Sequence, residues 1–383
     1  MHLPQMMLFN SLSGQTEKFQ TLKEKAVKMY VCGITPYDTT HLGHAFVYVQ
    51  FDVLKRFLEF KGYKVTYTQN VTDIDDDILK RAKRDGKDWV QLGDSWTKKF
   101  LKDLRDLNVL MPDHYIKATE AMDEIVEMVK ELIDKGFAYE IDGNVYFQVS
   151  RFSEYGKLSK YSEKEMLKLL KERGGDPADP QKKAPLDFLL WQKSKDDEPF
   201  WESPWGCGRP GWHIECSAMI KKTLGEQIDI HGGGFDLIYP HHESEIAQSE
   251  SFTTRRPFVK SWMHVAMVSY QGQKMSKSLG NLILVGDLLT TYSANSIRLM
   301  LLLNHYRKTW EYKEADMEEA KRIMEGLERT FKAVETDDTG VEELLIDLEK
   351  DFNTELSLKR IIITSKTQPG RSKAALQILG MKF

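Results

Sequence analysis

The segment from residue 28 to residue 70 constrains the fold most, because it alternates strand, loop, helix and strand. Residues 28–32 have the pattern of a short buried strand, and residues 33–43 form a loop that contains glycine and proline. Apolar residues then recur at helical spacing from His44 to Leu58, and residues 65–70 resume an extended pattern. This order is typical of the first half of a nucleotide-binding α/β domain, so we predict a Rossmann-like parallel sheet.

Two short motifs far apart in the chain indicate adenylate-forming chemistry. The first is Thr-His-Leu-Gly-His at residues 40–44, and the second is Lys-Met-Ser-Lys-Ser at residues 274–278. In this order and at this separation they resemble the two ATP-binding signatures of class I aminoacyl-tRNA synthetases and their relatives. The resemblance implies a carboxylic acid activated by ATP on a class I synthetase fold.

The residue types in both motifs suit this chemistry, which depends on positioning and electrostatic stabilisation. His41 and His44 lie where a loop enters a helix, so their ring nitrogens can donate to phosphate oxygens there. Gly43 lets the adenine approach the backbone closely. Lys274 and Lys277 can clamp the leaving pyrophosphate. Each motif alone also fits a surface histidine pair or a solvated lysine pair, and the presence of both favours catalysis.

A glycine run at residues 232–234, followed by Phe235 and Asp236, supplies further ATP-site candidates. We expect Gly233 to approach ATP and Asp236 to contact its ribose or the substrate ammonium group. A tight turn would explain glycine followed by aspartate equally well.

A metal site is suggested by cysteine, histidine and glutamate residues that are distant in sequence. The three cysteines are too few and odd in number for a disulfide framework. Cys32 and Cys216, with His241 and Glu245 four residues apart on one helix face, would make a tetrahedral zinc set. Their spacing leaves core cysteines beside an exposed helix start equally open. We expect Cys207 to be a small buried apolar residue.

Five segments together resemble cysteinyl-tRNA synthetases, and the match extends from about residue 24 to beyond residue 310. They are residues 32–35, 70–75, 208–216, 231–234 and 240–243. The resemblance implies zinc ligands Cys32, Cys216, His241 and Glu245, which bind the thiol of substrate cysteine. It also implies a cysteine pocket, with ATP as substrate and magnesium beside it. The pocket residues are Gly33, Thr35, Asn70, Thr72 and Trp212.

Zinc suits the selection of cysteine over serine. A thiol ionises on zinc and bonds strongly, whereas a hydroxyl is a poor soft ligand. A site built around one such contact can discriminate by about 10⁴–10⁵ without editing.

The acceptor of the activated cysteine is less constrained, because the chain also resembles the mycothiol-pathway cysteine ligase. That family joins cysteine to glucosaminyl-inositol. Glu245 and His231 follow the synthetase pattern, and Val47 stands where the ligase family has a threonine. We therefore expect tRNA-Cys as acceptor, with the amino sugar as the alternative. A non-catalytic zinc-binding RNA module is a third hypothesis. The segments closest to the ligase family are residues 35–44, 112–120 and 172–177.

We expect an inserted subdomain and a C-terminal helical bundle around the Rossmann-like core. About 30 residues follow Asp351-Phe-Asn-Thr, so we expect a curtailed bundle without an anticodon-binding domain. A basic loop at residues 364–373 should join its helices. The expected divisions are 1–110, 111–204, 205–270, 271–315 and 316–383, where 1–110 and 205–270 are the halves of the catalytic domain. Lys359, Arg360, Lys366, Arg371 and Lys373 could contact RNA phosphates or form a solvated face.

Composition adds three expectations. The chain has 383 residues and a net charge of −4, which neither supports nor excludes RNA binding. No apolar run approaches the roughly 20 residues that span a bilayer, and the N-terminus lacks signal-peptide features. We expect a cytoplasmic protein without a membrane partner, and a monomer.

Overall fold

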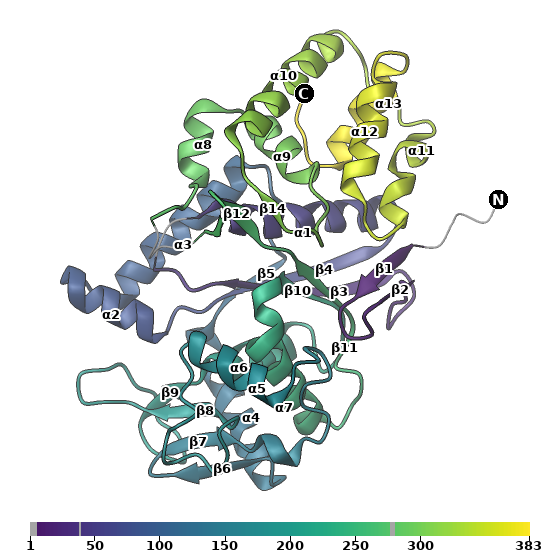
Figure 1. Cartoon of the computed structure of the whole chain (residues 1–383). Coiled ribbons are helices and arrows are strands. Elements are labelled where there is room, and N and C mark those ends of the chain that lie inside the picture. Colours follow the sequence, from purple (N-terminus) through teal and green to yellow (C-terminus); the bar gives the residue numbers. More distant parts are fainter. Residues whose placement is uncertain (1–5, 38–39, 276–279) are drawn as a thin grey trace.

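The computed structural model describes residues 6–37, 40–275 and 280–383, and its centre is a five-stranded parallel sheet (Figure 1). The strand order is β11-β10-β3-β4-β5, so β3 and β10 are neighbours although far apart in sequence. The order of the strands along the chain reverses between β3 and β10, where α/β sheets of this kind bind ligands. The predicted Rossmann-like fold is confirmed. The strands are β3 (Ala26–Ile34), β4 (Lys64–Val71), β5 (His114–Lys117), β10 (Ile228–Gly234) and β11 (Val259–Val265).

The two faces of the sheet bury separate hydrophobic cores. One core lies under α1 (Leu42–Phe60) and α9 (Ala294–Leu302), and the other lies under helices of the opposite layer. Met29 and Val31 of β3 belong to the first core, whereas Tyr30 and Cys32 belong to the second. This alternation follows from the two-residue period of a strand, and it turns Cys32 toward the second layer. That layer contains α4 (Met122–Asp134), α6 (Trp212–Thr223) and α7 (Glu243–Thr253).

A four-stranded antiparallel sheet is inserted between β5 and β10, in the lower part of Figure 1. Its first hairpin turns at Asp142 and Gly143, which both have positive φ angles. Helix α5 (Glu163–Glu172) precedes a loop rich in proline and glycine, and regular structure resumes at β8. The strands, in spatial order, are β6 (Ala138–Ile141), β7 (Asn144–Phe147), β8 (Phe188–Lys193) and β9 (Gly208–Pro210).

The C-terminal region is helical, as predicted, and lies on the α1 side of the sheet (Figure 1). The predicted basic loop at residues 364–373 is wrong in extent, because α13 already begins at Pro369. Proline suits the first helical turn, where its fixed φ is favourable and its missing N–H costs nothing. The helices are α10 (Glu314–Phe331), α11 (Val341–Leu345), α12 (Thr354–Thr364) and α13 (Pro369–Ile378). Within the described ranges, no helix has the length and apolar character needed to cross a membrane.

The remaining elements lie around the central sheet. Helices α2 (Asp76–Asp85) and α3 (Trp89–Asp106) follow β4. The strands β13-β12-β14 form a small sheet that carries the start of the second signature. Its strands are β12 (Val268–Tyr270), β13 (Gln273–Lys274) and β14 (Trp310–Glu311), α8 (Val285–Thr291) follows, and β1 (Met7–Asn10) and β2 (Gln15–Lys18) form an N-terminal hairpin.

Candidate active site and metal centre

Two buried cysteines meet at the point where the strand order reverses. Cys32 comes from the carboxyl end of β3, and Cys216 comes from α6, which packs on the same side of the sheet. Their Sγ atoms lie 3.9 Å apart, and both residues are buried and free of a disulfide. The thiols are therefore close enough to bind one ion together.

His241 and Glu245 complete a four-residue group around this thiol pair. His241 lies in a π-helical turn (Ile238–His242) that leads into α7, and its Nε2 lies 3.0 Å from Glu245 Oε1. The same carboxylate oxygen lies 3.8 Å from Cys32 Sγ. In a tetrahedral zinc site with sulfur, nitrogen and oxygen ligands, neighbouring ligand atoms are about 3.3–3.8 Å apart. The donor atoms of Cys32, Cys216, His241 and Glu245 lie within 4.8 Å of one another, so they fit such an ion.

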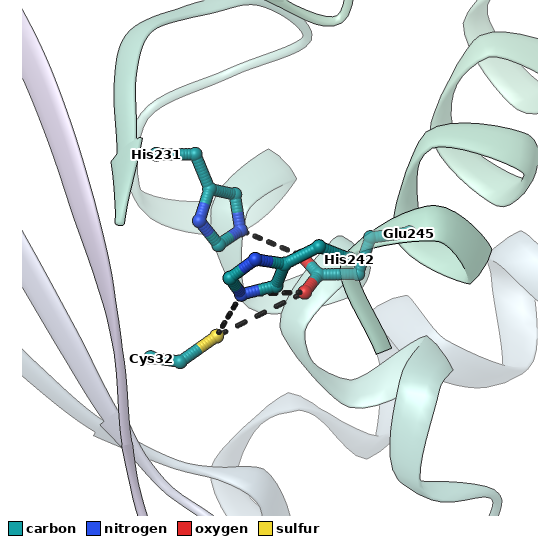
Figure 2. Close-up of side chains that lie close together, drawn as sticks. All are labelled: Cys32, His231, His242 and Glu245. Atoms are coloured by element: carbon teal, nitrogen blue, oxygen red, sulfur yellow. Dashed lines mark hydrogen bonds and ion pairs between the residues drawn. The ribbon is translucent and has the colours of Figure 1, made fainter. Parts of the chain in front are cut away.

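A second group of possible ligands overlaps the first and was not predicted from sequence. Figure 2 shows it: Cys32 and Glu245 are joined there by His231 and His242. His242 Nε2 lies 3.3 Å from Cys32 Sγ, and His231 Nε2 lies 2.9 Å from Glu245 Oε2. The signal for His242 was present, because it directly follows His241, but sequence could not say which imidazole faces the cysteine.

Charges inside the site are strongly coupled. Burial alone would raise the pKa of Glu245, but His231 and His241 outweigh it and lower the pKa to about 2. Burial likewise opposes ionisation of Cys216, yet a hydrogen bond from Cys32 and the nearby His241 lower its pKa to about 6. Burial raises the pKa of Cys32, and its hydrogen bond with Cys216 adds to this. A carboxylate and one thiolate are thus favoured here near neutral pH.

Further histidines surround the group and orient its rings. His213 Nδ1 lies 3.0 Å from His241 Nδ1, and His242 Nδ1 lies 2.8 Å from His264 Nε2. Burial lowers the pKa of His264 to about 3, so this ring is neutral at physiological pH. Contacts at the second nitrogen of an imidazole fix its tautomer and orientation, which is what a metal ligand requires.

The predicted cysteine-pocket residues lie beside this group. The Gly33 amide donates to Asn70 Oδ1 at 2.7 Å, and a Cβ on Gly33 would lie 1.6 Å from the Asn70 carbonyl oxygen. Glycine is therefore required for β3 and β4 to approach here. Thr72 is buried and accepts from Asn70 Nδ2 at 3.5 Å, and the Trp212 ring stacks on His241 at 4.4 Å. Thr35 follows directly after β3 and is half-buried.

The structure brings the two signature regions side by side. His41 forms a β-bridge with Leu284, and the Leu42 amide donates to the Ile283 carbonyl at 2.8 Å. His41 Nδ1 caps α1 by accepting from the Gly43 amide at 3.1 Å, and its ring stacks on His44 at 3.7 Å. Residues separated by more than 200 positions therefore share one edge of the sheet.

Two of the predicted ATP-site residues also meet. Lys274 Nζ lies 3.6 Å from Asp236 Oδ2, and both side chains are exposed. A Cβ on Gly43 would lie 3.0 Å from the His41 ring, and one on Gly233 would lie 2.8 Å from Leu237. Glycine at these two positions thus accommodates neighbouring side chains. Lys277 lies outside the described residues.

The structure corrects the prediction for Cys207. The expectation that Cys207 is buried is wrong, because its side chain is exposed. Cys207 precedes β9, an edge strand of the small antiparallel sheet, and therefore does not reach a core.

Four of the five basic residues singled out in the C-terminal region contact other residues of that region. Lys359 pairs with Glu355 at 2.7 Å, and Arg360 pairs with Asp347 at 2.8 Å. Lys373 donates to the Val334 carbonyl at 2.8 Å, Arg371 lies 3.8 Å from Glu343, and Lys366 is exposed. These contacts suit a solvated helical face, and a role in RNA binding stays a prediction.

Comparison with known proteins agrees with this arrangement. The family described as tRNA synthetases class I (C) catalytic domain matches residues 18–322. The cysteine–tRNA ligase of Dehalococcoides mccartyi strain 195 is 45% identical over 367 residues, which cover 93% of this chain and 79% of the relative. The cysteine–tRNA ligase of Thermococcus onnurineus is 48% identical over 327 residues, 85% of this chain and 68% of the relative.

A solved structure, Mycobacterium tuberculosis methionyl-tRNA synthetase in complex with methionyl-adenylate, has the same fold. Its TM-score is 0.66 at 16% identity, with 92% of this chain and 88% of that chain covered. The solved structure shares the fold, and the family match and the relatives show the family. This chain therefore belongs to the cysteinyl-tRNA synthetase family of class I synthetases and is an aminoacyl-tRNA synthetase enzyme.

Proposed function

We propose that this chain activates L-cysteine with ATP to cysteinyl-adenylate, with release of pyrophosphate, and transfers the cysteinyl group to tRNA-Cys. The observation that carries the proposal is the buried group of two thiols, an imidazole and a carboxylate beside Trp212, at the sheet edge shared with both signature regions. The names of the relatives, cysteine–tRNA ligases, support the same substrates.

Zinc is the ion that this donor set suits, and Cys32, Cys216, His241 and Glu245 would hold it. Bound zinc would supply an electrophile that lowers the pKa of the substrate thiol and so selects cysteine over serine. The chain's own residues position the rest of the substrate: Trp212 stacks over His241, and Gly33, near the carboxyl end of β3, lies with its backbone beside Asn70.

The signature residues would handle ATP. His41 and His44 lie at the start of α1, where imidazole N–H groups and helix amides can stabilise phosphate charge. Lys274 and Asp236 lie side by side, where the lysine would bind pyrophosphate and the aspartate would bind the ribose. Lys277, Gly43 and Gly233 complete the proposed ATP site, with magnesium beside the phosphates. We also propose a monomer organised by the divisions expected from sequence.

The test is a pair of assays on one zinc-loaded preparation. Cysteine-dependent exchange of pyrophosphate with ATP measures activation, and transfer of radiolabelled cysteine measures the acceptor. A tRNA-Cys transcript and glucosaminyl-inositol are offered in parallel. We expect exchange and labelling of the tRNA. Labelling of the amino sugar alone would assign the chain to thiol biosynthesis, and failure to exchange pyrophosphate would favour a non-catalytic RNA module.

A further inference from the structure

A buried tyrosine adjoins the thiol pair and has no role in the proposed reaction. Tyr30 lies in β3, two residues before Cys32, so both side chains point to the same face of the sheet. Its side chain is fully buried and belongs to the same hydrophobic core as Cys32 and Cys216. The polar end of Tyr30 is therefore enclosed with the proposed metal ligands and kept from solvent.

The pairing of β3 with β10 fixes where the Tyr30 ring lies. Tyr30 is directly opposite His231 in the register of the two strands, and their rings contact edge to face with centres 5.1 Å apart. His231 is in turn held by Glu245, at 2.9 Å. The ring of Tyr30 thus lies against the group of possible ligands, in a close-packed interior that leaves it little freedom to turn.

The hydroxyl of Tyr30 needs an acceptor. Within the described part of the chain it has no complete hydrogen bond, which is unfavourable for a buried hydroxyl. Burial raises its pKa, and the negative charges that Cys216, Cys32 and Glu245 would carry raise it further. Of these three, Cys216 also acts on the hydroxyl as a hydrogen-bond acceptor. The sulfur of Cys216 is therefore the acceptor that this position offers.

The proposed metal site carries an excess of negative charge. Two thiolates and one carboxylate would bring three negative charges, so a zinc ion held by Cys32, Cys216, His241 and Glu245 leaves one of them uncompensated. A substrate thiolate would add another. Buried charge is unfavourable without compensation, and hydrogen bonds to the ligands help to disperse it. A phenol O–H is a suitable donor, because it stays protonated at neutral pH.

We propose that Tyr30 is a positioning residue of the metal centre, whose hydroxyl donates a hydrogen bond to the Cys216 thiolate when zinc is bound. This inference rests on the proposed zinc-dependent activation of cysteine. The hydrogen bond draws electron density from the sulfur, so the ion stays electrophilic enough to bind the thiol of the substrate. Tyr30 thereby supports the selection of cysteine without touching it.

The first test measures metal binding without substrate. Tyr30→Phe removes one oxygen atom and keeps the ring that packs on His231. Its affinity for zinc, measured by competition with a chelator, should fall by about 10- to 100-fold, as is typical when the partner of a metal ligand is lost. Tyr115→Phe is the matched control and should keep the wild-type affinity. Tyr115 also has a buried hydroxyl without a partner among the described residues, but it packs against the other core.

The second test observes the sulfur directly. Cobalt(II) takes the place of zinc, and charge transfer from the thiolates to cobalt gives an absorption band. Without the hydrogen bond the sulfur gives up an electron more easily, so the band of Tyr30→Phe should move to longer wavelength at unchanged intensity. The KM for cysteine in pyrophosphate exchange should rise, while the KM for ATP should stay the same. A merely structural role would instead weaken the band and raise both constants.

Each result has one meaning. An unchanged band and an unchanged zinc affinity in Tyr30→Phe overturn the hydrogen bond to Cys216. Loss of the whole band at saturating cobalt also overturns it, because the hydroxyl would then be needed for the site to form. Wild-type protein that binds zinc but fails to exchange pyrophosphate overturns the proposed function and leaves the hydrogen bond from Tyr30 standing. Wild-type protein that binds no zinc overturns the proposed metal site and this inference with it.

Discussion

The buried ion pair between Asp52 and Arg298 should be essential for stability, because it ties α1 to the C-terminal segment. Arg298 Nη2 lies 2.5 Å from Asp52 Oδ2, and neither side chain is exposed to solvent. Arg298 also donates to the carbonyls of Leu107 and Leu379, at 3.1 and 2.6 Å. The helix that begins beside His41 is thus held against residues at the other end of the chain.

The two single variants differ in which charged side chain stays buried without its partner. Removing one member of a buried pair costs about 3–5 kcal/mol, because the other charge stays buried and uncompensated. In Arg298→Met, Asp52 still accepts from Arg56 Nε at 3.0 Å and from the Leu110 amide at 2.8 Å, so we expect about 3 kcal/mol. In Asp52→Leu, the buried Arg298 charge has lost its carboxylate, so we expect about 4–5 kcal/mol.

Urea unfolding of the wild type, both single variants and the double variant measures these free energies. The double variant buries neither charge, so its cost should fall below the sum of the single costs by about 1–3 kcal/mol. Simple additivity, or a cost below about 1 kcal/mol for either single variant, would refute the reasoning.

Three further predictions concern the metal group, a close contact and pH. Cys216→Ser should lose zinc and cysteine activation together, measured as metal content and pyrophosphate exchange, because one thiolate of the four-ligand group is removed. Gly232→Ala should cost about 1–3 kcal/mol in urea unfolding, because its Cβ would lie 2.0 Å from the buried Phe51 ring. Burial, against the nearby Asp351, lowers the pKa of His305, so the unfolded chain binds its proton more readily. The free energy of unfolding should therefore fall as pH drops below about 6.5. His305→Gln should make this pH dependence weaker, and urea unfolding from about pH 7.5 to 5.5 measures it.

Matched variants make these outcomes decisive. Cys207→Ser changes an exposed thiol and should keep zinc and activity, and normal zinc in Cys216→Ser would refute the metal assignment. Gly326→Ala in α10 has open space, with its nearest atom 4.0 Å away, and should stabilise by about 0.5–1 kcal/mol. Equal behaviour of the two glycine variants would contradict the contact argument. If the free energy of unfolding depends on pH in the same way in His305→Gln as in the wild type, other groups cause the loss of stability in acid.

Local patterns in the chain were sufficient for much of the fold. The alternation in β3, the helical spacing of α1 and the turn at Asp142-Gly143 depend on neighbouring residues, so sequence predicts them well. The pair of His241 and Glu245 could be predicted for the same reason, because residues four apart meet on adjoining turns. Family resemblance, rather than spacing, joined this pair to the two cysteines.

The sequence by itself determined which chemistry is available: two thiols, an imidazole, a carboxylate and two ATP-type signatures on an alternating α/β pattern. Only the tertiary structure decided which of these side chains lie close together. The pairing of β3 with β10 brings Cys32 to His231, and packing of α7 turns His242 toward the same thiol. Likewise, Trp89 and Trp201 lie edge to face because distant segments pack together. Periodicity sets the face of each element, whereas contacts between elements depend on strand order and side-chain volume throughout the core.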